Sequence, residues 1–336
     1  MPADRAARFA ALAASFASRR ILVVGDLMLD EFIWGKVSRI SPEAPVPIVN
    51  VTGESYYPGG AANVARNLKE FTPHVSVMGL AGNDAAGDRL LSLLNDAGID
   101  TGGVQRDMSA ETITKTRIVA RNQQVVRVDR ERQSALSAAE TARALGHFDT
   151  VVSGVDAIVV ADYGKGFVTQ PLADHLSRRA REHGKILTVD PHPHTSLNWS
   201  GITAVKPNRL EAFLAAGVPP SESVTPVLAD QPLLEVGRRL RRHWQAENLL
   251  ITLGEHGMLL FAGDAPPSHM PTHAKEVFDV SGAGDTAIAV LTLGLAAGAS
   301  AEDAAEMANL ASGIAVGKLG TATVTLDELQ ASFRTP

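Results

Sequence analysis

The chain has 336 residues, of which 45% are hydrophobic and 20% are charged, and its net charge is −6. This composition is typical of a soluble globular protein, and the acidic balance excludes a nucleic-acid-binding surface spread over the whole molecule. Cysteine is absent, which excludes disulfides and thiolate metal sites and is compatible with a reducing cytoplasm. The longest uncharged apolar run, residues 286–301, is too short to span a bilayer, so we expect no membrane partner.

The first segment, about residues 1–20, has the pattern of an amphipathic helix and lacks the apolar core of a signal peptide. After it, residues 21–25 form a continuous apolar run, which is typical of a strand buried on both faces of a parallel sheet. Further strands are predicted at 74–81, 157–161, 186–189, 204–206, 249–253 and 258–261. Helices are predicted at 85–97, 137–147, 170–182, 208–216, 233–246, 283–297 and 301–316. This alternation predicts an α/β fold with a predominantly parallel sheet covered on both faces.

Two stretches depart from this pattern and predict a smaller β-sheet. Residues 31–51 alternate apolar residues with three prolines, which excludes a helix and favours short edge strands with turns. Residues 112–129 are rich in β-branched residues, with Asn122-Gln123 as the turn of a hairpin. We expect one domain over 1–336, with segments of about 31–52 and 110–130 forming a lid. One face of the lid would cover a ligand, and its apolar face would pair with a second copy of the chain in a homodimer.

Polar or glycine residues follow strand after strand along the chain. They are Asp26, Asp162, Asp190, Asn208 and Gly254. The carboxyl ends of parallel strands lie at one edge of a sheet, where ligands bind. These residues are therefore expected to line one cleft.

The stretch 279–286, Asp-Val-Ser-Gly-Ala-Gly-Asp-Thr, places glycines and an acid at the start of a predicted helix. Free N–H groups and the helix dipole make such a start an anion site. Asp285 inside it makes sense as a base that takes a proton from an attacking hydroxyl while the N–H groups stabilise a phosphoryl group. A simple helix cap explains the same residues equally well.

Three other motifs each have a functional and a structural interpretation. Residues 59–63, Gly-Gly-Ala-Ala-Asn, fit a polyol site but fit a glycine turn better. Asn208 and Glu211 fit a water-mediated Mg²⁺ site or a capping box. The run 252–257, Thr-Leu-Gly-Glu-His-Gly, fits a nucleotide site or an ordinary hairpin. His192 and His194 lack a suitably spaced third ligand, so a loop role is favoured over a metal site.

Taken together and in this order, the stretches 59–63, 208–211 and 279–286 resemble the signatures of the ribokinase-like (PfkB) carbohydrate kinases, across residues 21 to about 329. Residues 24–30, 38–47, 121–124 and 316–321 more closely resemble D-glycero-β-D-manno-heptose 7-phosphate kinases. That resemblance implies a cytoplasmic enzyme that transfers the ATP γ-phosphoryl group to the anomeric hydroxyl of a sugar phosphate. ATP, Mg²⁺ and a monovalent cation are the implied cofactors. The implied product is the 1,7-bisphosphate used for ADP-heptose and the lipopolysaccharide inner core.

The resemblance also implies roles for individual residues. Asp285 would be the base, beside an anion hole formed by the backbone of Gly282, Ala283 and Gly284. The ATP and metal side would comprise Asn208, Glu211, Thr252, Gly254, Gly257 and Asn309, with Glu211 acting on Mg²⁺ through water and Asp190 as a second metal residue. The sugar side would comprise Asp26, Gly59, Gly60, Asn63 and Asp162.

Two further expectations concern cations. Related heptose kinases carry Lys where this chain has His192, so either a protonated His192 serves the triphosphate, or Lys206 or Lys165 shares the task. For the 7-phosphate, position alone favours Arg39, Arg117 and Lys165, with Arg66 and Arg121 in reserve.

Three alternatives stay open at this point. The first is another sugar or nucleoside kinase of the same superfamily. The second is a non-catalytic, sugar-responsive binding module on a kinase scaffold. The third is a Rossmann dehydrogenase, which the missing G-x-G-x-x-G fingerprint disfavours.

Overall fold

The computed structural model describes residues 2–108, 111–121, 123–131, 136–195, 197–274, 277–318 and 322–333. The turn residue Asn122 lies outside these residues, as do Leu319, Gly320 and Thr321 of the stretch 316–321. Within the described ranges, none of the helices has both the length and the apolar character needed to cross a membrane.

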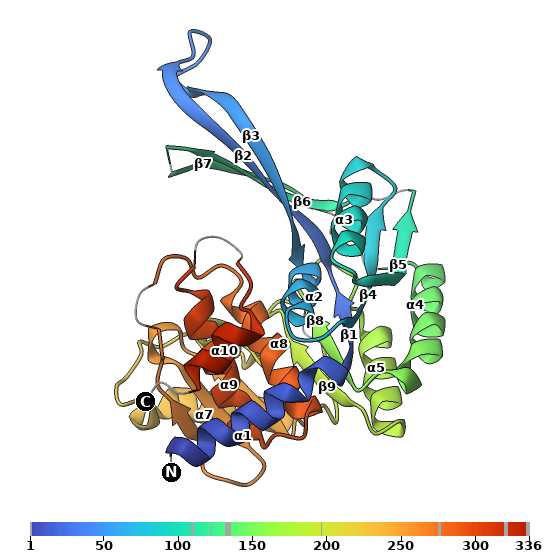
Figure 1. The fold of residues 1–336 in the computed structure, drawn as a ribbon, viewed down its shortest axis with the longest axis vertical. Helices are drawn as coiled ribbons and strands as arrows, with labels where there is room; N and C mark the ends of the chain where they lie inside the picture. The colour runs from blue at the N-terminus through green and yellow to red at the C-terminus, as the bar shows by residue number, and fades with distance from the viewer. Residues whose placement is uncertain are drawn as a thin grey trace.

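A nine-stranded sheet forms the centre of the molecule, in the order β13-β12-β11-β10-β9-β8-β1-β4-β5 (Figure 1). Neighbouring strands from β11 to β5 are parallel, whereas β12 runs antiparallel to both β11 and β13. The predicted, predominantly parallel sheet is therefore confirmed. The strands are β1 (Arg20–Gly25), β4 (His74–Gly82), β5 (Asp100–Asp107), β8 (Ala157–Ala161), β9 (Ile186–Asp190), β10 (Ala204–Val205), β11 (Asn248–Thr252), β12 (Met258–Ala262) and β13 (Ser268–Met270).

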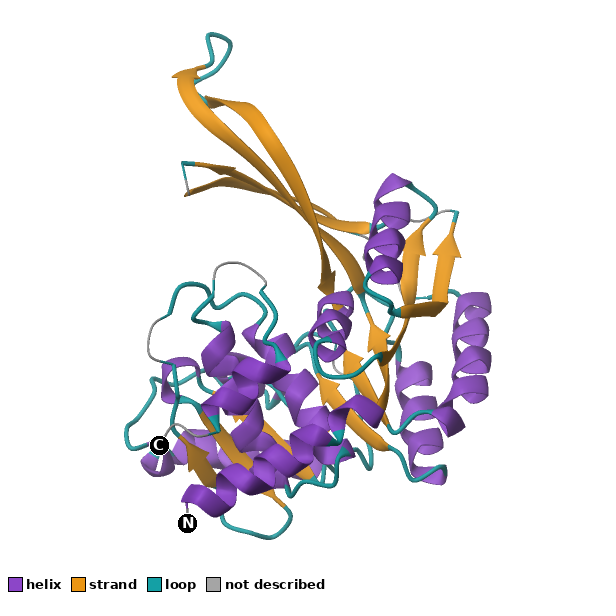
Figure 2. Ribbon diagram, viewed as in Figure 1, coloured by secondary structure: helices purple, strands orange, loops and turns teal. Residues whose placement is uncertain are grey.

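Helices cover both faces of this sheet (Figure 2). Successive residues of a strand point to opposite faces, so Val159 of β8 joins one buried cluster while its neighbour Val160 joins the other. The first cluster packs under α1 (Pro2–Ala14), α2 (Ala61–Lys69), α3 (Ala85–Asp96), α8 (Ala283–Ala296), α9 (Ala301–Ala315) and α10 (Leu326–Ser332). The second packs under α4 (Ala138–Val151), α5 (Gln170–Glu182), α6 (Arg209–Ala215) and α7 (Gln231–His243).

A second, four-stranded sheet stands off the body of the molecule (Figure 1). Its order is β3-β2-β6-β7, from β2 (Leu27–Ile40), β3 (Pro47–Gly60), β6 (Ile113–Ala120) and β7 (Gln123–Arg130). We call it the lid sheet. The predicted pairing of the two β stretches is confirmed, with β2 and β6 parallel.

The expectation of short edge strands over 31–51 is wrong, because β2 and β3 each contain 14 residues. The prolines do not interrupt them. Pro42 and Pro45 lie in the connection between the strands, and Pro47 is the first residue of β3, where proline is tolerated in a strand. The hairpin can therefore be long.

Sequence reasoning missed three short elements. The edge strand β5 has the sequence Asp-Thr-Gly-Gly-Val-Gln-Arg-Asp, which carries no apolar pattern, and β13 has only three residues. The helix α10 begins with a capping box formed by Thr325 and Glu328, a signal that was readable in the sequence. In addition, α4 extends to Val151 rather than to about His147.

Candidate active site

Five neighbouring parallel strands, β11-β10-β9-β8-β1, end at the same edge of the main sheet. The polar strand-end residues of the sequence analysis therefore share this edge, as predicted: Asp26, Asp162, Asp190, Asn208 and Gly254. The start of α8 adds Asp285 to the group, because Asp285 interacts electrostatically with Asp190. Several carboxylates lie close together at this edge. Because an unpaired charge is costly away from water, each carboxylate needs hydrogen-bond donors or cations beside it.

The start of α8 has the geometry of an anion site. Gly282 is the N-cap with φ of 80°, in the left-handed region that glycine adopts without strain. Ala283 N–H donates to Val280 O over 3.3 Å. The N–H groups of Gly282 and Gly284 donate to no acceptor among the described residues. Of the three N–H groups predicted to form the anion hole, those of Gly282 and Gly284 are therefore free among the described residues, and that of Ala283 makes one long hydrogen bond.

Two hydrogen bonds join α2 to α8. Asn63 Nδ2 donates to Asp285 Oδ2 over 2.6 Å, and Thr286 Oγ1 donates to Asn67 Oδ1 over 2.7 Å. Asn63 and Asn67 are one helical turn apart, so both face α8, and both are buried. The side chain of Asn63 keeps one buried oxygen, Oδ1, without a hydrogen-bond partner among the described residues. The α2 contact therefore fixes the position of Asp285.

Tyr163 is a site residue that sequence reasoning did not single out. Its hydroxyl donates to Asp285 Oδ1 over 2.6 Å. Burial raises the pKa of Tyr163 well above its usual value, and the Asp285 charge raises it further, so the phenol stays protonated. Burial also raises the pKa of Asp285, while Tyr163, Asn63 and Lys206 lower it. The place of Tyr163 directly after the β8 strand end was the available signal.

Asp26, at the end of β1, contacts the backbone of the loop that follows β8. Its Oδ2 accepts from the N–H groups of Tyr163 (2.9 Å) and Lys165 (3.1 Å), and its Oδ1 accepts from Phe167 N–H (3.0 Å). Gly25 permits this approach, because a Cβ there would lie 2.0 Å from Ala161 O. The structure thus shows Asp26 organising a loop, and its predicted contact with sugar hydroxyls stays a prediction.

Asp162 is likewise engaged within the loops at this edge. Its Oδ1 accepts from Gly164 N–H over 2.8 Å, and its Oδ2 accepts from Thr195 Oγ1 over 2.6 Å. Burial raises the pKa of Asp162 to about 6, although both hydrogen bonds act in the opposite direction.

A buried ion pair joins the ends of β9 and β10. Lys206 Nζ lies 3.0 Å from Asp190 Oδ2, and Lys206 is only 3% exposed. Burial raises the pKa of Asp190 to about 7, with Lys206 lowering it and the nearby Glu211 raising it. A Cβ on Gly284 would lie 3.5 Å from Lys206 Nζ. The Lys206 ammonium therefore lies next to the predicted anion hole.

The role of His192 as a cation for the triphosphate stays a prediction, and its surroundings oppose a charged ring. Burial and His194 lower its pKa, which favours the neutral imidazole. Its Nδ1 is buried without a hydrogen-bond partner, against Gly164. Among the described residues, no group of three or more His, Cys, Asp or Glu side chains could hold a metal ion.

Asn208 and Glu211 form the capping box that the structural interpretation predicted. Asn208 Oδ1 accepts from Glu211 N–H over 2.9 Å, and Glu211 Oε2 accepts from Asn208 N–H over 2.7 Å. This box starts α6 at the sheet edge and leaves Glu211 Oε1 for other partners.

The residues expected to bind nucleotide lie around the β11–β12 hairpin. Thr252 ends β11 and has Asn208 beside it in an isolated bridge. Gly254 has φ of 59° and open space where a Cβ would stand, whereas a Cβ on Gly257 would lie 2.0 Å from Met270 O. Asn309 Nδ2 donates to Pro271 O over 2.7 Å. Gly254 is thus open to a ligand, while Gly257 and Asn309 are packed against the chain.

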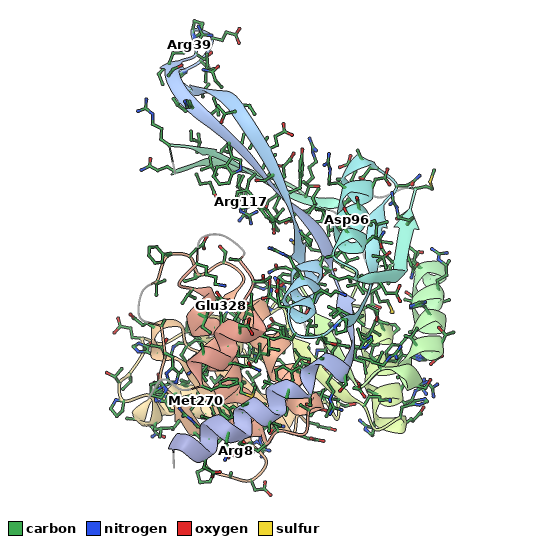
Figure 3. All side chains as sticks on the ribbon, in the orientation of Figure 1. Arg8, Arg39, Asp96, Arg117, Met270 and Glu328 are labelled. Atoms are coloured by element: carbon green, nitrogen blue, oxygen red, sulfur yellow. The ribbon has the colours of Figure 1, made fainter. Side chains whose placement is uncertain are left out.

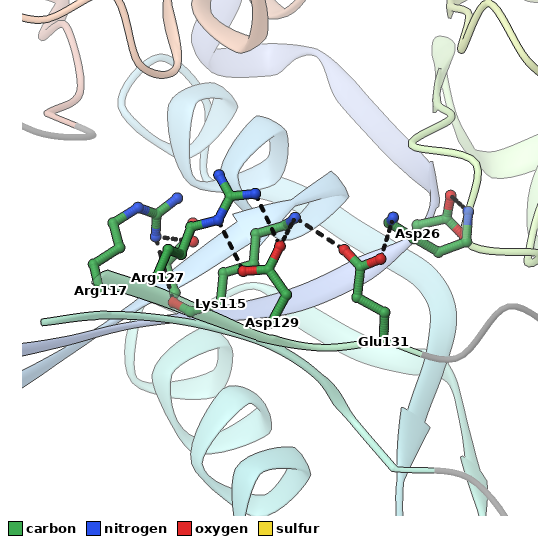
Figure 4. A network of polar contacts seen from close by, with 8 residues as sticks. Asp26, Lys115, Arg117, Arg127, Asp129 and Glu131 are labelled. Carbon is green, nitrogen blue, oxygen red and sulfur yellow. Dashed lines mark hydrogen bonds and ion pairs between the residues drawn. The ribbon is translucent and has the colours of Figure 1, made fainter. Parts of the chain in front are cut away.

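The lid sheet presents a row of charged side chains on one face (Figure 4). The register pairs Lys115 with Asp30 and with Asp129, so these side chains share a face. Lys115 Nζ lies 3.2 Å from Glu131 and 3.4 Å from Asp129. Arg117, one pair further along this face, donates to Asp30, and Arg127 contacts Asp129 over 2.8 Å.

Lys165 connects this face to the body of the molecule. Its Nζ lies 2.8 Å from Glu131 Oε2, so Glu131 bridges Lys165 and Lys115. Arg39, by contrast, lies toward the far end of the β2–β3 hairpin, well beyond Arg117 (Figure 3). The two reserve residues lie elsewhere: Arg66 stacks over Tyr57, and Arg121 is exposed at the end of the β6–β7 hairpin. Lys115, Arg127 and Glu131 are charged site residues that sequence reasoning missed.

Comparison with known protein families identifies the class of protein. Residues 18–328 match the model of the pfkB family of carbohydrate kinases, and the chain belongs to that family. It is 43% identical to the bifunctional protein HldE of Desulfatibacillum aliphaticivorans over 95% of this chain and 64% of that protein, and 42% identical to HldE of Magnetococcus marinus over 97% and 66%. The chain therefore spans less than two thirds of the length of these relatives.

Solved structures show the same fold. Arabidopsis thaliana ribokinase complexed with ribose and ATP superposes with a TM-score of 0.70 at 16% identity, covering 95% of this chain and 99% of that chain. Escherichia coli phosphofructokinase-2 in complex with potassium gives 0.72 at 20% identity, covering 94% and 98%. The predicted ribokinase-like fold is confirmed, and family membership excludes the dehydrogenase alternative.

The α2–α8 contact leads to a first prediction. Thr286→Val should destabilise the protein by about 1–3 kcal/mol, because it leaves the buried Asn67 Oδ1 without its donor. Thr150→Val, at an exposed residue whose hydroxyl donates to His147 O, should change stability by less than about 0.5 kcal/mol. Urea unfolding measures both, and equal effects would show that the Thr286 hydrogen bond does not hold α2 to α8.

Proposed function

We propose that the chain transfers the ATP γ-phosphoryl group to the anomeric hydroxyl of D-glycero-β-D-manno-heptose 7-phosphate. The product would be the 1,7-bisphosphate, which enters ADP-heptose and lipopolysaccharide inner-core biosynthesis in the cytoplasm. The observation that carries the proposal is a half-buried carboxylate, Asp285, at a helix N-terminus with two free N–H groups, below a lid face that bears three cations and is joined to the body by a fourth, Lys165. A phosphorylated sugar would place its hydroxyl beside Asp285 and its phosphate beside the cations. The alternatives are another PfkB-type sugar or sugar-phosphate kinase, and a non-catalytic sugar-binding regulator.

Asp285 would act as the general base. The ionised carboxylate takes the proton of the anomeric hydroxyl, the sugar oxygen forms a bond to the γ-phosphorus, and the bond from that phosphorus to the β,γ-bridging oxygen breaks to release ADP. The free N–H groups of Gly282 and Gly284 would stabilise the charge on the phosphoryl group in transfer, joined by Ala283 N–H once it leaves Val280 O. Closure of the lid would keep water from competing as the acceptor.

The ATP side supports a Mg²⁺-dependent reaction. Mg²⁺ is bound by one or two carboxylates together with substrate phosphates and waters, and Asp190 and Glu211 supply two carboxylates close enough to interact. Glu211 would act through water and Asp190 directly, and the ion would neutralise phosphate charge. Lys206 would provide the cation that His192 lacks. The implied monovalent cation stays a prediction.

The nucleotide itself would lie along the β11–β12 hairpin, between Thr252 and the open Gly254. Gly257 and Asn309 would shape this site through the backbone segments they pack against. Asn208, through its capping box, would place Glu211 for the metal.

The sugar would lie between α2 and the lid sheet. Asn63 Oδ1 is a buried acceptor without a partner, and a sugar hydroxyl would satisfy it. Gly59 leaves room for Asp30, since a Cβ there would lie 2.5 Å from Asp30 Oδ2. Gly60 has φ of 58° and turns the chain into α2. Asp26 and Asp162 would contribute mainly by holding the loop after β8.

The terminal phosphate of the sugar would bind to the cations that Glu131 now bridges. Lys115 and Lys165 are largely shielded from solvent, at 18% and 17% side-chain exposure, so a phosphate could replace Glu131 between them with little new desolvation. Arg117 and Arg127 border the same face. Arg39 is too far along the hairpin in this structure to join them without a movement of the lid (Figure 3).

The opposite face of the lid sheet supports a homodimer. Ile118 pairs with Val126, and Thr116 with Val128, on the face away from Lys115, and Val126 and Val128 are 45% and 46% exposed. Exposed valines side by side on a sheet face favour contact with another protein surface. Escherichia coli phosphofructokinase-2, which has the same fold, has a tetrameric inhibited form.

Kinase assays on a panel of sugars test the function directly. Heptose 7-phosphate should give ADP with a kcat/KM at least ~100-fold above that of the same heptose without phosphate, fructose 6-phosphate or ribose. Heptose and ribose lack the phosphate that the cations would bind, and fructose 6-phosphate carries it at a different distance from the anomeric hydroxyl. Asp285→Asn should lower kcat at least ~100-fold while ATP binding survives. If another sugar were phosphorylated with a higher kcat/KM, the first alternative, another PfkB-type sugar or sugar-phosphate kinase, would replace this proposal. An active Asp285→Asn variant would remove the assigned base.

Lys165→Met tests the phosphate contact. It should raise KM for heptose 7-phosphate by about 10–100-fold, since a charge-assisted hydrogen bond is lost, and leave turnover of unphosphorylated heptose unchanged. Lys185→Met, whose Nζ bonds to Ser153 O on the outer surface, is the matched control and should not change KM. If Lys165→Met reduced activity equally with heptose 7-phosphate and with unphosphorylated heptose, the sugar phosphate would bind away from Lys165.

Val128→Asp tests the dimer. A carboxylate on the apolar lid face should shift the chain from dimer to monomer in sedimentation velocity, because burying a charge at an interface is costly. Val224→Asp, at a valine of similar exposure outside the lid sheet, should leave the dimer intact. A monomeric wild type, or a dimeric Val128→Asp variant, would contradict the proposed interface.

A further inference from the structure

Both carboxylate oxygens of Asp285 are engaged by neutral donors. Asn63 Nδ2 donates to Oδ2, and the Tyr163 hydroxyl donates to Oδ1, each over 2.6 Å. Asn63 belongs to a buried helix, α2, but Tyr163 belongs to the loop at 162–167. The presence of Tyr163 beside Asp285 therefore depends on what holds that loop.

Two buried carboxylates hold the loop at 162–167 in place. Asp26 accepts three backbone N–H groups, from Tyr163, Lys165 and Phe167, and Asp162 accepts a fourth, from Gly164. Asp26 and Asp162 are only 2% and 6% exposed. A carboxylate has about four lone-pair positions, so Asp26 satisfies three donors at once. The loop is thus fixed in one conformation that points the Tyr163 hydroxyl at Asp285.

The charges around Asp285 show why a neutral donor matters there. Lys206, directly after β10, lowers the pKa of Asp285 and Asp30 from β2 raises it, while the carboxyl of Asp190 in β9 also interacts with Asp285. The ammonium of Lys206 is directly paired with Asp190. Hydrogen bonds from neutral groups favour the ionised carboxylate without adding a full positive charge that would weaken it as a base.

We propose that Tyr163 is a positioning residue for the base: its hydroxyl, set by the loop that Asp26 holds, orients Asp285 and, as a hydrogen-bond donor, favours the charged carboxylate. This rests on the proposed role of Asp285 and adds to it a residue that orients the base. Oδ1 has a second lone pair, so the acceptor hydroxyl of the sugar can bind there while Tyr163 stays in place.

Tyr163→Phe tests the proposal through the pH profile of kcat/KM. Loss of the hydrogen bond removes a group that favours the charged form, so the acid limb should move to higher pH. At the acid end kcat/KM should fall about tenfold relative to wild type, and at the alkaline end it should stay within about threefold. Tyr56→Phe is the matched control, because Tyr56 also donates to a carboxylate, Glu54, over 2.6 Å but stands on the lid sheet; its profile should equal that of wild type.

A second measurement needs no substrate and separates this proposal from the choice of sugar. The carbon-13 shift of the Asp285 carboxyl, assigned with Asp285→Asn, should titrate at higher pH in Tyr163→Phe than in wild type. An unchanged midpoint, or a rate loss that is equal at all pH values, would overturn the role of Tyr163. Failure of wild type to phosphorylate heptose 7-phosphate, with the midpoint shift intact, would overturn the proposed substrate alone.

Discussion

A half-buried carboxylate, Asp285, is the constraint on which this structure depends. Burial favours its protonated form, whereas the role of general base that we propose for it requires the ionised form. Three neighbours oppose the effect of burial on the pKa: Asn63 from α2, Tyr163 from the loop after β8, and Lys206 directly after β10. The main sheet brings all three to one edge because its strands are parallel. The position of Asp285 at the start of α8 also puts free N–H groups beside it.

At the same edge, each carboxylate or capping group has its own hydrogen-bond donor or cation. Asp26 and Asp162 face backbone N–H groups, Asp190 faces Lys206, and Asn208 caps α6 together with Glu211. Each of these contacts has a structural role, and the functional roles that we propose use the same contacts. A residue that fixes a loop or starts a helix can do so in order to place a neighbour. Asp26 does this for Tyr163.

Much of the fold was predictable because its signals are local. Apolar runs ending in Gly or Asp marked the parallel strands, and the stretch 279–286 marked the start of α8. The long lid strands were not predictable, because the three prolines of 31–51 suggested interruption, whereas β2 and β3 pair with each other over their whole length. Tyr163, Lys115 and Glu131 were also missed. Their roles arise from contacts between distant segments, such as Tyr163 with Asp285 and Lys165 with Glu131, and no spacing along the chain reports these.

A structure of the chain with heptose 7-phosphate and a non-hydrolysable ATP analogue tests the central claim most directly. The account predicts the anomeric oxygen within about 3 Å of an Asp285 carboxylate oxygen, with the γ-phosphate at the start of α8. It also predicts the sugar phosphate between Lys115 and Lys165, with Glu131 displaced. An anomeric carbon turned away from Asp285, or a sugar phosphate bound away from the lid face, would contradict it.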